Sequence, residues 1–158
     1  MILYHGSNCE IEKIDLAMCK PFKDFGQAFY LTTILVQARE MAKKVADRFG
    51  GTPCVNAFDF NDKDMSCLKI KLFDRPDREW AEFVMANRSR GQKHPADDFD
   101  LIIGPVANDD IATLFRTYEI GVITLDELVQ GMKSRKLNNQ YAFRSERAIG
   151  LLHKRVSK

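Results

Sequence analysis

The chain has 158 residues, which is the length of one ordinary domain. Hydrophobic residues make up 45% and charged residues 29%, a balance typical of a globular protein and not of a disordered or membrane-embedded chain. Lys and Arg number 24 against 22 Asp and Glu, so the net charge of +2 excludes a general electrostatic attraction to nucleic acid. We therefore expect a single domain over residues 1–158.

The N-terminal ten residues contain no basic leader followed by a long apolar run, and no stretch has the length of a membrane span. The cysteines show neither a CxxC spacing nor a nearby His pair that would complete a zinc site. They are Cys9, Cys19, Cys54 and Cys67. We expect free thiols, no metal, no membrane partner and a cytoplasmic location.

The first half of the chain predicts two short strands and a helix. Residues 2–5 and residues 28–33 are apolar runs rich in aromatic and β-branched side chains, which favours strands. Residues 36–49 have helical spacing, and Gly50 ends the helix. The apolar positions expected to face the core are Val36, Met41, Val45 and Phe49.

The second half alternates between strands and helices. Residues 99–107 form an unbroken apolar run, which predicts a central strand covered on both sides. Thr124 and Glu127 have the spacing of a capping box, so a helix begins there. The other expected elements are strands at 54–60, 68–73 and 140–144, a helix at 77–88, and a short helix capped by Ser145. This order predicts an α+β fold with a central sheet flanked by helices.

Three short stretches place polar or aromatic side chains beside strand ends, which core packing does not require. They are Tyr4-His5-Gly6-Ser7, Phe25-Gly26-Gln27-Ala28-Phe29-Tyr30 and Asn139-Gln140-Tyr141. Each is weak by itself, because a single His after a strand is often a hydrogen-bonded structural residue, and a single Tyr in an apolar strand is often part of the core.

Taken in order, the three stretches resemble the nucleotide-binding core of ADP-ribosyltransferases of the diphtheria-toxin and poly(ADP-ribose) polymerase type. That family has His-Gly-Ser or His-Gly-Thr on the first strand, Gly-x-Gly-x-Tyr leading into a helix, and Asn-Glu-Tyr on the last central strand. Segments outside the motifs, such as DFDLIIGPVANDD and GVITLDEL, are similar to a bacterial family of small ADP-ribosyltransferase-like proteins, some of which are associated with an antitoxin. The resemblance implies a split, mixed β-sheet of the ADP-ribosyltransferase type.

The resemblance also implies roles for individual residues, with NAD as substrate. His5, Tyr30 and Gln140 would be catalytic: His5 would bind a ribose hydroxyl, Tyr30 would stack on the cationic nicotinamide ring, and Gln140 would occupy the position of the glutamate. The backbone of Gly6 would bind the carboxamide. Ser7, Gly26 and Met41 would complete the NAD pocket.

The sequence departs from the family pattern at three positions, which are Ala28, Met41 and Gln140. Gln140 matters most because an amide brings no charge to a developing cation. A unit charge about 4 Å away at an effective dielectric constant of about 20 contributes about 4 kcal/mol, which is a rate factor on the order of a thousand. Glu146 could supply charge from nearby, although its position favours a helix-capping role.

The resemblance therefore implies an NAD-dependent mono-ADP-ribosyltransferase that is toxin-like, cleaves the bond to nicotinamide and modifies a macromolecular acceptor. Gln140 keeps two alternatives open, an NAD glycohydrolase and a catalytically silent module that binds a nucleotide or a partner protein. The family resemblance alone implies a cognate antitoxin.

Two further patterns have simpler interpretations. Asp24-Phe25-Gly26 matches a kinase triplet, but the chain lacks the other kinase motifs, so we interpret it as a turn. Five aspartates flank the central strand without the spacing of a metal-binding loop, and we interpret them as solvated strand ends. They are Asp97, Asp98, Asp100, Asp109 and Asp110.

Overall fold

The computed structural model describes residues 1–90 and 97–156 and has an α+β fold with two β-sheets. The first sheet is antiparallel in the order β1 (Ile2–Ser7), β3 (Cys54–Asp59) and β7 (His153–Lys154). The second is mixed, in the order β2 (Phe29–Leu31), β6 (Asn139–Phe143), β5 (Leu101–Pro105) and β4 (Ile70–Leu72). In the second sheet only β4 and β5 pair in parallel.

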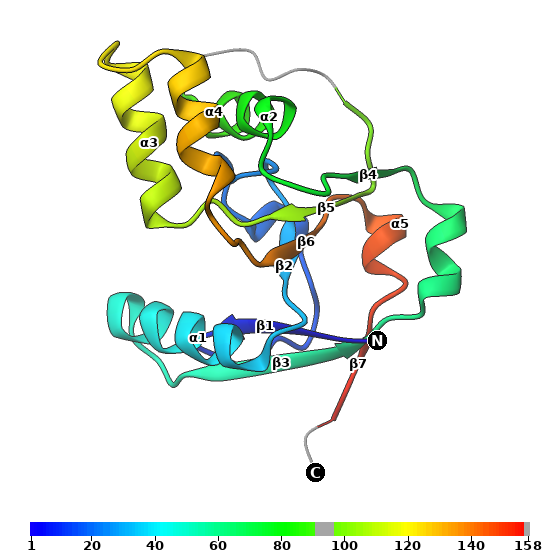
Figure 1. Ribbon diagram of the computed structural model, residues 1–158. Helices are drawn as coiled ribbons and strands as arrows, with labels where there is room; N and C mark the ends of the chain where they lie inside the picture. Colours follow the sequence, from blue (N-terminus) through cyan, green and yellow to red (C-terminus); the bar gives the residue numbers. More distant parts are fainter. Residues whose placement is uncertain (91–96, 157–158) are drawn as a thin grey trace.

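An isolated backbone bridge joins the two sheets. Tyr4 and Thr32 exchange both backbone hydrogen bonds, at 2.8 and 2.9 Å, so β1 lies along the free edge of β2. The two sheets therefore meet where β1 passes β2, with β1, β3 and β7 in one sheet and β2, β6, β5 and β4 in the other (Figure 1). This arrangement brings the first motif of the chain next to the second.

Five α-helices of the described residues surround the sheets. Helix α1 (Leu35–Phe49) packs on β1, and α5 (Glu146–Ile149) follows β6. Helices α2 (Arg78–Arg88), α3 (Asp109–Glu119) and α4 (Leu125–Lys133) group on the opposite side of the second sheet (Figure 1). Two short 3₁₀ helices, Leu16–Met18 and Asp62–Cys67, lie in connecting segments.

The mixed sheet is buried on both faces. One face carries Tyr30, Ile102 and Ala142 into a core cluster with α2, α3 and α4. The other face carries Leu101 and Phe143, together with other apolar side chains, against β1, β3 and α5. The prediction of a central strand covered on both sides is confirmed, because every residue of β5 is buried.

The predicted helix ends are confirmed where a side-chain cap is recognisable in the sequence. Thr124 and Glu127 form the capping box, with Glu127 Oε2 accepting from the Thr124 N–H at 2.6 Å. The Ser145 hydroxyl accepts from the Ala148 N–H at 3.1 Å and begins α5. Helix α3 is an element that the sequence patterns do not predict, and its cap is Asn108, whose side chain accepts from the Ile111 N–H at 3.0 Å.

The predicted buried face of α1 is wrong. Val36, Met41 and Phe49 are 60%, 52% and 54% exposed, and the side chains that α1 buries are alanines. These are Ala38, Ala42 and Ala46. Alanine is small enough to let the helix backbone approach β1 closely, while Val45 is half-buried and the other three predicted residues are exposed.

The aspartates around β5 are only partly solvated strand ends. Asp100 is buried and accepts from the Lys69 N–H at 2.8 Å and the Ser145 hydroxyl at 2.6 Å, and it pairs with Arg147. Asp97 pairs with Arg144. Asp109 and Asp110 form the first turn of α3, where a carboxylate interacts favourably with the helix dipole. The interpretation as solvated ends is therefore wrong for Asp100, whose charge is compensated inside the protein.

Candidate functional site

The register of β2 and β6 places two of the predicted catalytic residues on one face of the sheet. Tyr30 lies opposite Ala142, and Gln140 lies two residues away from Ala142 on the same strand. Because side chains alternate along a strand, Tyr30, Ala142 and Gln140 point to the same side. Such a diagonal pair is separated by about 7–8 Å.

His5 contacts the backbone of β2 from the other sheet. Its Nδ1 lies 2.7 Å from the carbonyl oxygen of Tyr30, and its ring stacks on Phe29 with 4.4 Å between the ring centroids. Since a carbonyl only accepts, Nδ1 carries the hydrogen in this bond and Nε2 keeps a lone pair. Burial lowers the pKa of His5 more than the carbonyl bond raises it, so the ring is neutral at neutral pH.

The hydroxyl of Tyr30 fixes the loop that leads into β2. It donates to the carbonyl of Gly26 at 2.6 Å and accepts from the N–H of Phe25 at 3.0 Å. Burial is the main cause that raises the pKa of the Tyr30 phenol above its usual value, so the hydroxyl stays protonated. Gly26 has a φ of +79°, in the left-handed region that favours glycine. The tight turn predicted at residues 24–26 is thus present.

The other predicted site residues differ in how closely they approach these three. Ser7 is half-buried at the end of β1, opposite Cys54. Gly6 is buried because α1 passes directly over it: a Cβ atom there would lie 2.1 Å from the Ala38 carbonyl oxygen. Met41 is 52% exposed on α1, which turns its alanines, and not Met41, toward β1.

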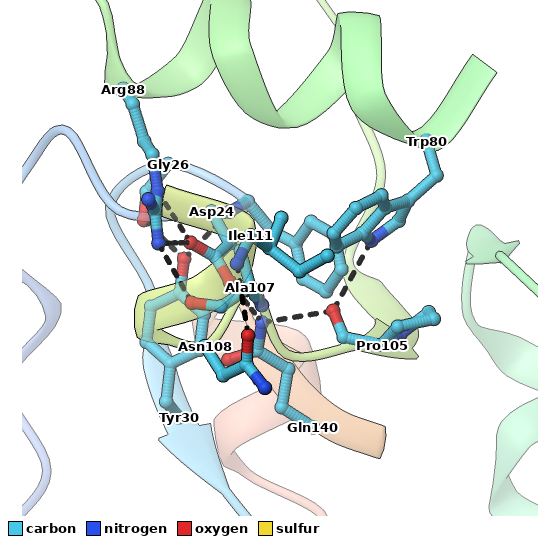
Figure 2. Close-up of polar contacts among 11 residues, drawn as sticks. Asp24, Gly26, Tyr30, Trp80, Arg88, Pro105, Ala107, Asn108, Ile111 and Gln140 are labelled. Atoms are coloured by element: carbon cyan, nitrogen blue, oxygen red, sulfur yellow. Dashed lines mark hydrogen bonds and ion pairs between the residues drawn. The ribbon is translucent and has the colours of Figure 1, made fainter. Parts of the chain in front are cut away.

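A buried carboxylate that the sequence motifs do not identify as a site residue lies at the centre of this region. Asp24 is only 6% exposed, and Figure 2 shows it between Arg88 of α2, Ala107 after β5 and Gln140 of β6. Arg88 donates to Oδ1 through Nε at 2.7 Å, and its Nη2 forms an ion pair with the same oxygen at 2.6 Å. The N–H of Ala107 and Nε2 of Gln140 donate to Oδ2 at 3.0 and 2.8 Å. We call Asp24 with these three partners the Asp24 hub.

The Asp24 hub joins four parts of the chain that are far apart in sequence. Arg88 also donates to the carbonyl of Ala107 at 3.2 Å, and Nε2 of Gln140 lies 3.4 Å from the carbonyl of Pro105. The same Pro105 carbonyl accepts from the indole N–H of Trp80 at 3.2 Å (Figure 2). A charge buried this deeply is tolerated because Arg88 compensates it and every carboxylate oxygen accepts hydrogen bonds.

Glu146, the alternative source of negative charge, is exposed at the first position of α5. This is the helix-capping position that its sequence context indicates. The carboxylate nearest to Gln140 is therefore that of Asp24, which contacts it directly.

Two surface hollows lie on the described part of the chain, but neither is lined by His5, Tyr30 or Gln140. One is lined by residues 72–79 between β4 and α2, and the other by residues of the β4–α2 segment and α4. What supports the candidate site is the face shared by Tyr30 and Gln140 and the contact of His5 with the Tyr30 carbonyl. Across residues 1–90 and 97–156, no cluster of His, Cys, Asp or Glu side chains is suited to hold a metal ion.

Comparison with models of protein families gives a match over nearly the whole chain. A family model described as "Protein of unknown function (DUF3990)" matches residues 1–153, which is nearly the whole chain. The chain belongs to the DUF3990 family. No curated protein and no solved structure matches it.

The matched DUF3990 region contains all of the candidate site residues, from His5 to Gln140, and the Asp24 hub. Within the residues that the structure describes, no helix of this DUF3990 chain is long and apolar enough to cross a membrane. Cys9, Cys19, Cys54 and Cys67 are free thiols.

Tyr30→Phe removes the hydroxyl of Tyr30 and keeps its aromatic ring, and we expect this change to destabilise the protein. In Tyr30→Phe, the N–H of Phe25 and the carbonyl of Gly26 lose their shared partner. Leaving such groups unpaired costs about 1–3 kcal/mol. Urea denaturation should show this loss, whereas Tyr118→Phe, whose hydroxyl bonds to no other described residue, should leave the midpoint unchanged. Equal midpoints for wild type and Tyr30→Phe would contradict the proposed role.

Proposed function

We propose that this DUF3990 protein is an NAD-dependent mono-ADP-ribosyltransferase of the toxin-like type. The observation that supports it is the arrangement of three residues that are up to 135 positions apart in the sequence: Tyr30 and Gln140 share one face of the β2–β6 pair, and His5 hydrogen-bonds to the Tyr30 carbonyl. His5 and Tyr30 match the motifs of the ADP-ribosyltransferase family, and Gln140 occupies the position of that family's glutamate. A fold of that type is part of the proposal.

The proposed reaction breaks the bond between the ribose C1′ and the nicotinamide nitrogen of NAD. The bonding electron pair leaves with nicotinamide, which thereby becomes neutral, and a nucleophile of the acceptor forms the new bond to C1′ and releases its proton to solvent. The leaving group is already cationic, so no general acid is needed. The protein has to hold NAD in a reactive shape and stabilise the cationic ribosyl centre.

The chemistry of the three residues fits these tasks. Neutral His5 has a lone pair at Nε2 that could accept from a ribose hydroxyl, because Nδ1 is engaged with the Tyr30 carbonyl. The aromatic ring of Tyr30 suits a cationic nicotinamide ring. Gln140 keeps its Oε1 available as an acceptor, since Nε2 donates to Asp24.

The first prediction of this proposal is that the purified protein releases nicotinamide from NAD and transfers labelled ADP-ribose to a component of a bacterial cell extract. His5→Ala is expected to reduce nicotinamide release by at least about a hundredfold, since it removes a group that orients the substrate. His153→Ala is the matched control, because His153 is an exposed residue of β7, remote from the site, and should act like wild type.

The same assay separates the proposal from its two alternatives. Release of free ADP-ribose at the same rate with and without extract would indicate an NAD glycohydrolase. Absence of nicotinamide release under every condition, with or without NAD binding measured by calorimetry, would refute the transferase proposal and favour a silent binding module.

A further inference from the structure

The Asp24 hub determines which chemical group can occupy position 140. Both Asp24 oxygens act only as acceptors, and Oδ2 receives N–H groups from Ala107 and Gln140. A side chain that meets Oδ2 must therefore present a hydrogen. The carbonyl of Pro105, 3.4 Å from Gln140 Nε2, is a second acceptor that faces the same atom. Glutamine meets this requirement through its NH₂ group, whereas an ionised glutamate presents only acceptors.

We propose that Asp24 is the positioning residue of Gln140, and that this site is built for an amide in place of the glutamate expected on the last central strand. The inference deepens the proposed function and rests on it. Asp24 and Pro105 select Nε2 as the inward atom of the amide and leave Oε1 as the atom that faces away from the hub. A ribose hydroxyl of NAD would then meet a fixed acceptor.

Charge compensation supports the same assignment. Arg88 forms one hydrogen bond and an ion pair with Asp24 Oδ1, so the pair carries no net charge. A carboxylate at position 140 would be the second negative group at the hub and would have no cation of its own among the contacts of Gln140. Two carboxylates that share one site cannot both ionise freely, and one pKa is raised. An ionised glutamate at position 140 would therefore destabilise this site.

The test is the pH dependence of thermal unfolding in Gln140→Glu, compared with wild type and with Gln130→Glu. Gln130 is exposed on α4, so the same exchange there leaves the new carboxylate in water, one helical turn from Asp126 and Glu127, where charge repulsion is weak. At pH 5, the introduced carboxyl group, when protonated, can donate its O–H to Asp24 as the amide does. Because the native state favours this protonated form, stability is lost as the pH rises through the raised pKa.

We expect Gln140→Glu to unfold within about 2 °C of wild type at pH 5 and at least about 6 °C below it at pH 8, a shift that a lost hydrogen bond and charge repulsion can produce in a chain of this size. Gln130→Glu should follow wild type at both pH values. A Gln140→Glu variant that follows wild type at pH 8 would overturn the inference, and so would one that cleaves NAD faster than wild type.

A second variant separates positioning from packing. Gln140→Met keeps the length of the side chain without charge or polar atoms, so its unfolding temperature should show the same pH dependence as wild type. Its kcat for nicotinamide release should fall by about a hundredfold, with little change in KM, because the oriented oxygen is missing. Wild-type kcat in Gln140→Met would refute a positioning role. If wild type itself releases no nicotinamide, the proposed function fails, while the pH experiment still decides whether Asp24 requires an amide partner.

Discussion

Replacement of Asp24 by asparagine is expected to lower the free energy of unfolding by about 3–5 kcal/mol, as occurs when one partner of a buried ion pair is removed. The reason is the number of donors. Three N–H groups, one each from Arg88, Ala107 and Gln140, donate to the two carboxylate oxygens, and Nη2 of Arg88 forms an ion pair with Oδ1. Asparagine has a single oxygen, so its NH₂ group must face donors on one side or the other.

Either orientation of the introduced amide leaves an uncompensated group. With NH₂ toward Arg88, the guanidinium keeps only the carbonyl of Ala107. With NH₂ toward Ala107, a buried backbone N–H loses its partner and Gln140 Nε2 loses its stronger acceptor. The side chain of Arg88 is 31% exposed and can bind water, which places the first case at the lower end of the range.

Urea denaturation at pH 7 measures the effect, and Asp98→Asn is the matched control. Asp98 pairs with Lys69 between two largely exposed side chains, and such pairs contribute little to stability. The unfolding curve of Asp98→Asn should therefore superimpose on that of wild type. If Asp24→Asn lowers the free energy of unfolding by less than about 1 kcal/mol, the size of one ordinary hydrogen bond, the Asp24 hub does not stabilise the fold as an ion-paired network.

Local patterns predict those parts of the fold that local forces determine. The capping box of Thr124 and Glu127 satisfies backbone donors within one helical turn, so its sequence spacing is sufficient evidence for the start of α4. The apolar run around β5 is also informative, since a strand buried on both faces needs such a run. The start of α3 at Asn108 is missing from the prediction, although an Asn followed by two acidic residues is a recognisable cap.

The face that α1 buries depends on information outside the helix. Val36, Met41 and Phe49 are larger and more apolar than Ala38 and Ala42, so periodicity alone favours them as core residues. The deciding factor is the close approach of the α1 backbone to Gly6, which leaves room for nothing larger than alanine between helix and strand. A sequence pattern within residues 36–49 cannot reveal the residue on the other side of the contact.

The same limit applies to the candidate site. The motifs around His5, Tyr30 and Gln140 identify these residues by resemblance, and the pairing of β2 with β6 brings two of them to one face. Asp24 and Gln140 are 116 positions apart, and Asp24 belongs to a triplet that by itself indicates only a turn. No local spacing connects them, so the partner that defines the chemistry of Gln140 is visible only in three dimensions.

Gly6→Ala is expected to lower the free energy of unfolding by about 3 kcal/mol, because α1 passes close to Gly6. This value is the upper end of the usual cost of overpacking. The added Cβ would lie 2.1 Å from the Ala38 carbonyl oxygen and 2.6 Å from the Ala42 nitrogen. Both atoms belong to the backbone of α1, so no side-chain rotation relieves the contact and the helix itself must move. Thermal and urea unfolding measure the loss.

Gly150→Ala is the matched control, since Gly150 has an ordinary helical conformation and a Cβ there meets nothing closer than 3.4 Å. That exchange is expected to stabilise the protein by about 0.4–1 kcal/mol. An unchanged stability in Gly6→Ala would contradict the close packing of α1 on β1.

The Gly6 result also decides how the His-Gly-Ser motif is interpreted. Because the glycine is required by packing alone, loss of nicotinamide release in Gly6→Ala would not demonstrate recognition of the carboxamide by its backbone. The double variant Gly6→Ala/Ala42→Gly tests whether the added Cβ clashes with the backbone of α1 or with the Ala42 side chain. The clash is with backbone atoms, so removing the Ala42 side chain should restore neither stability nor turnover. Recovery of both would mean that side-chain crowding, and not the backbone of α1, is what keeps position 6 a glycine.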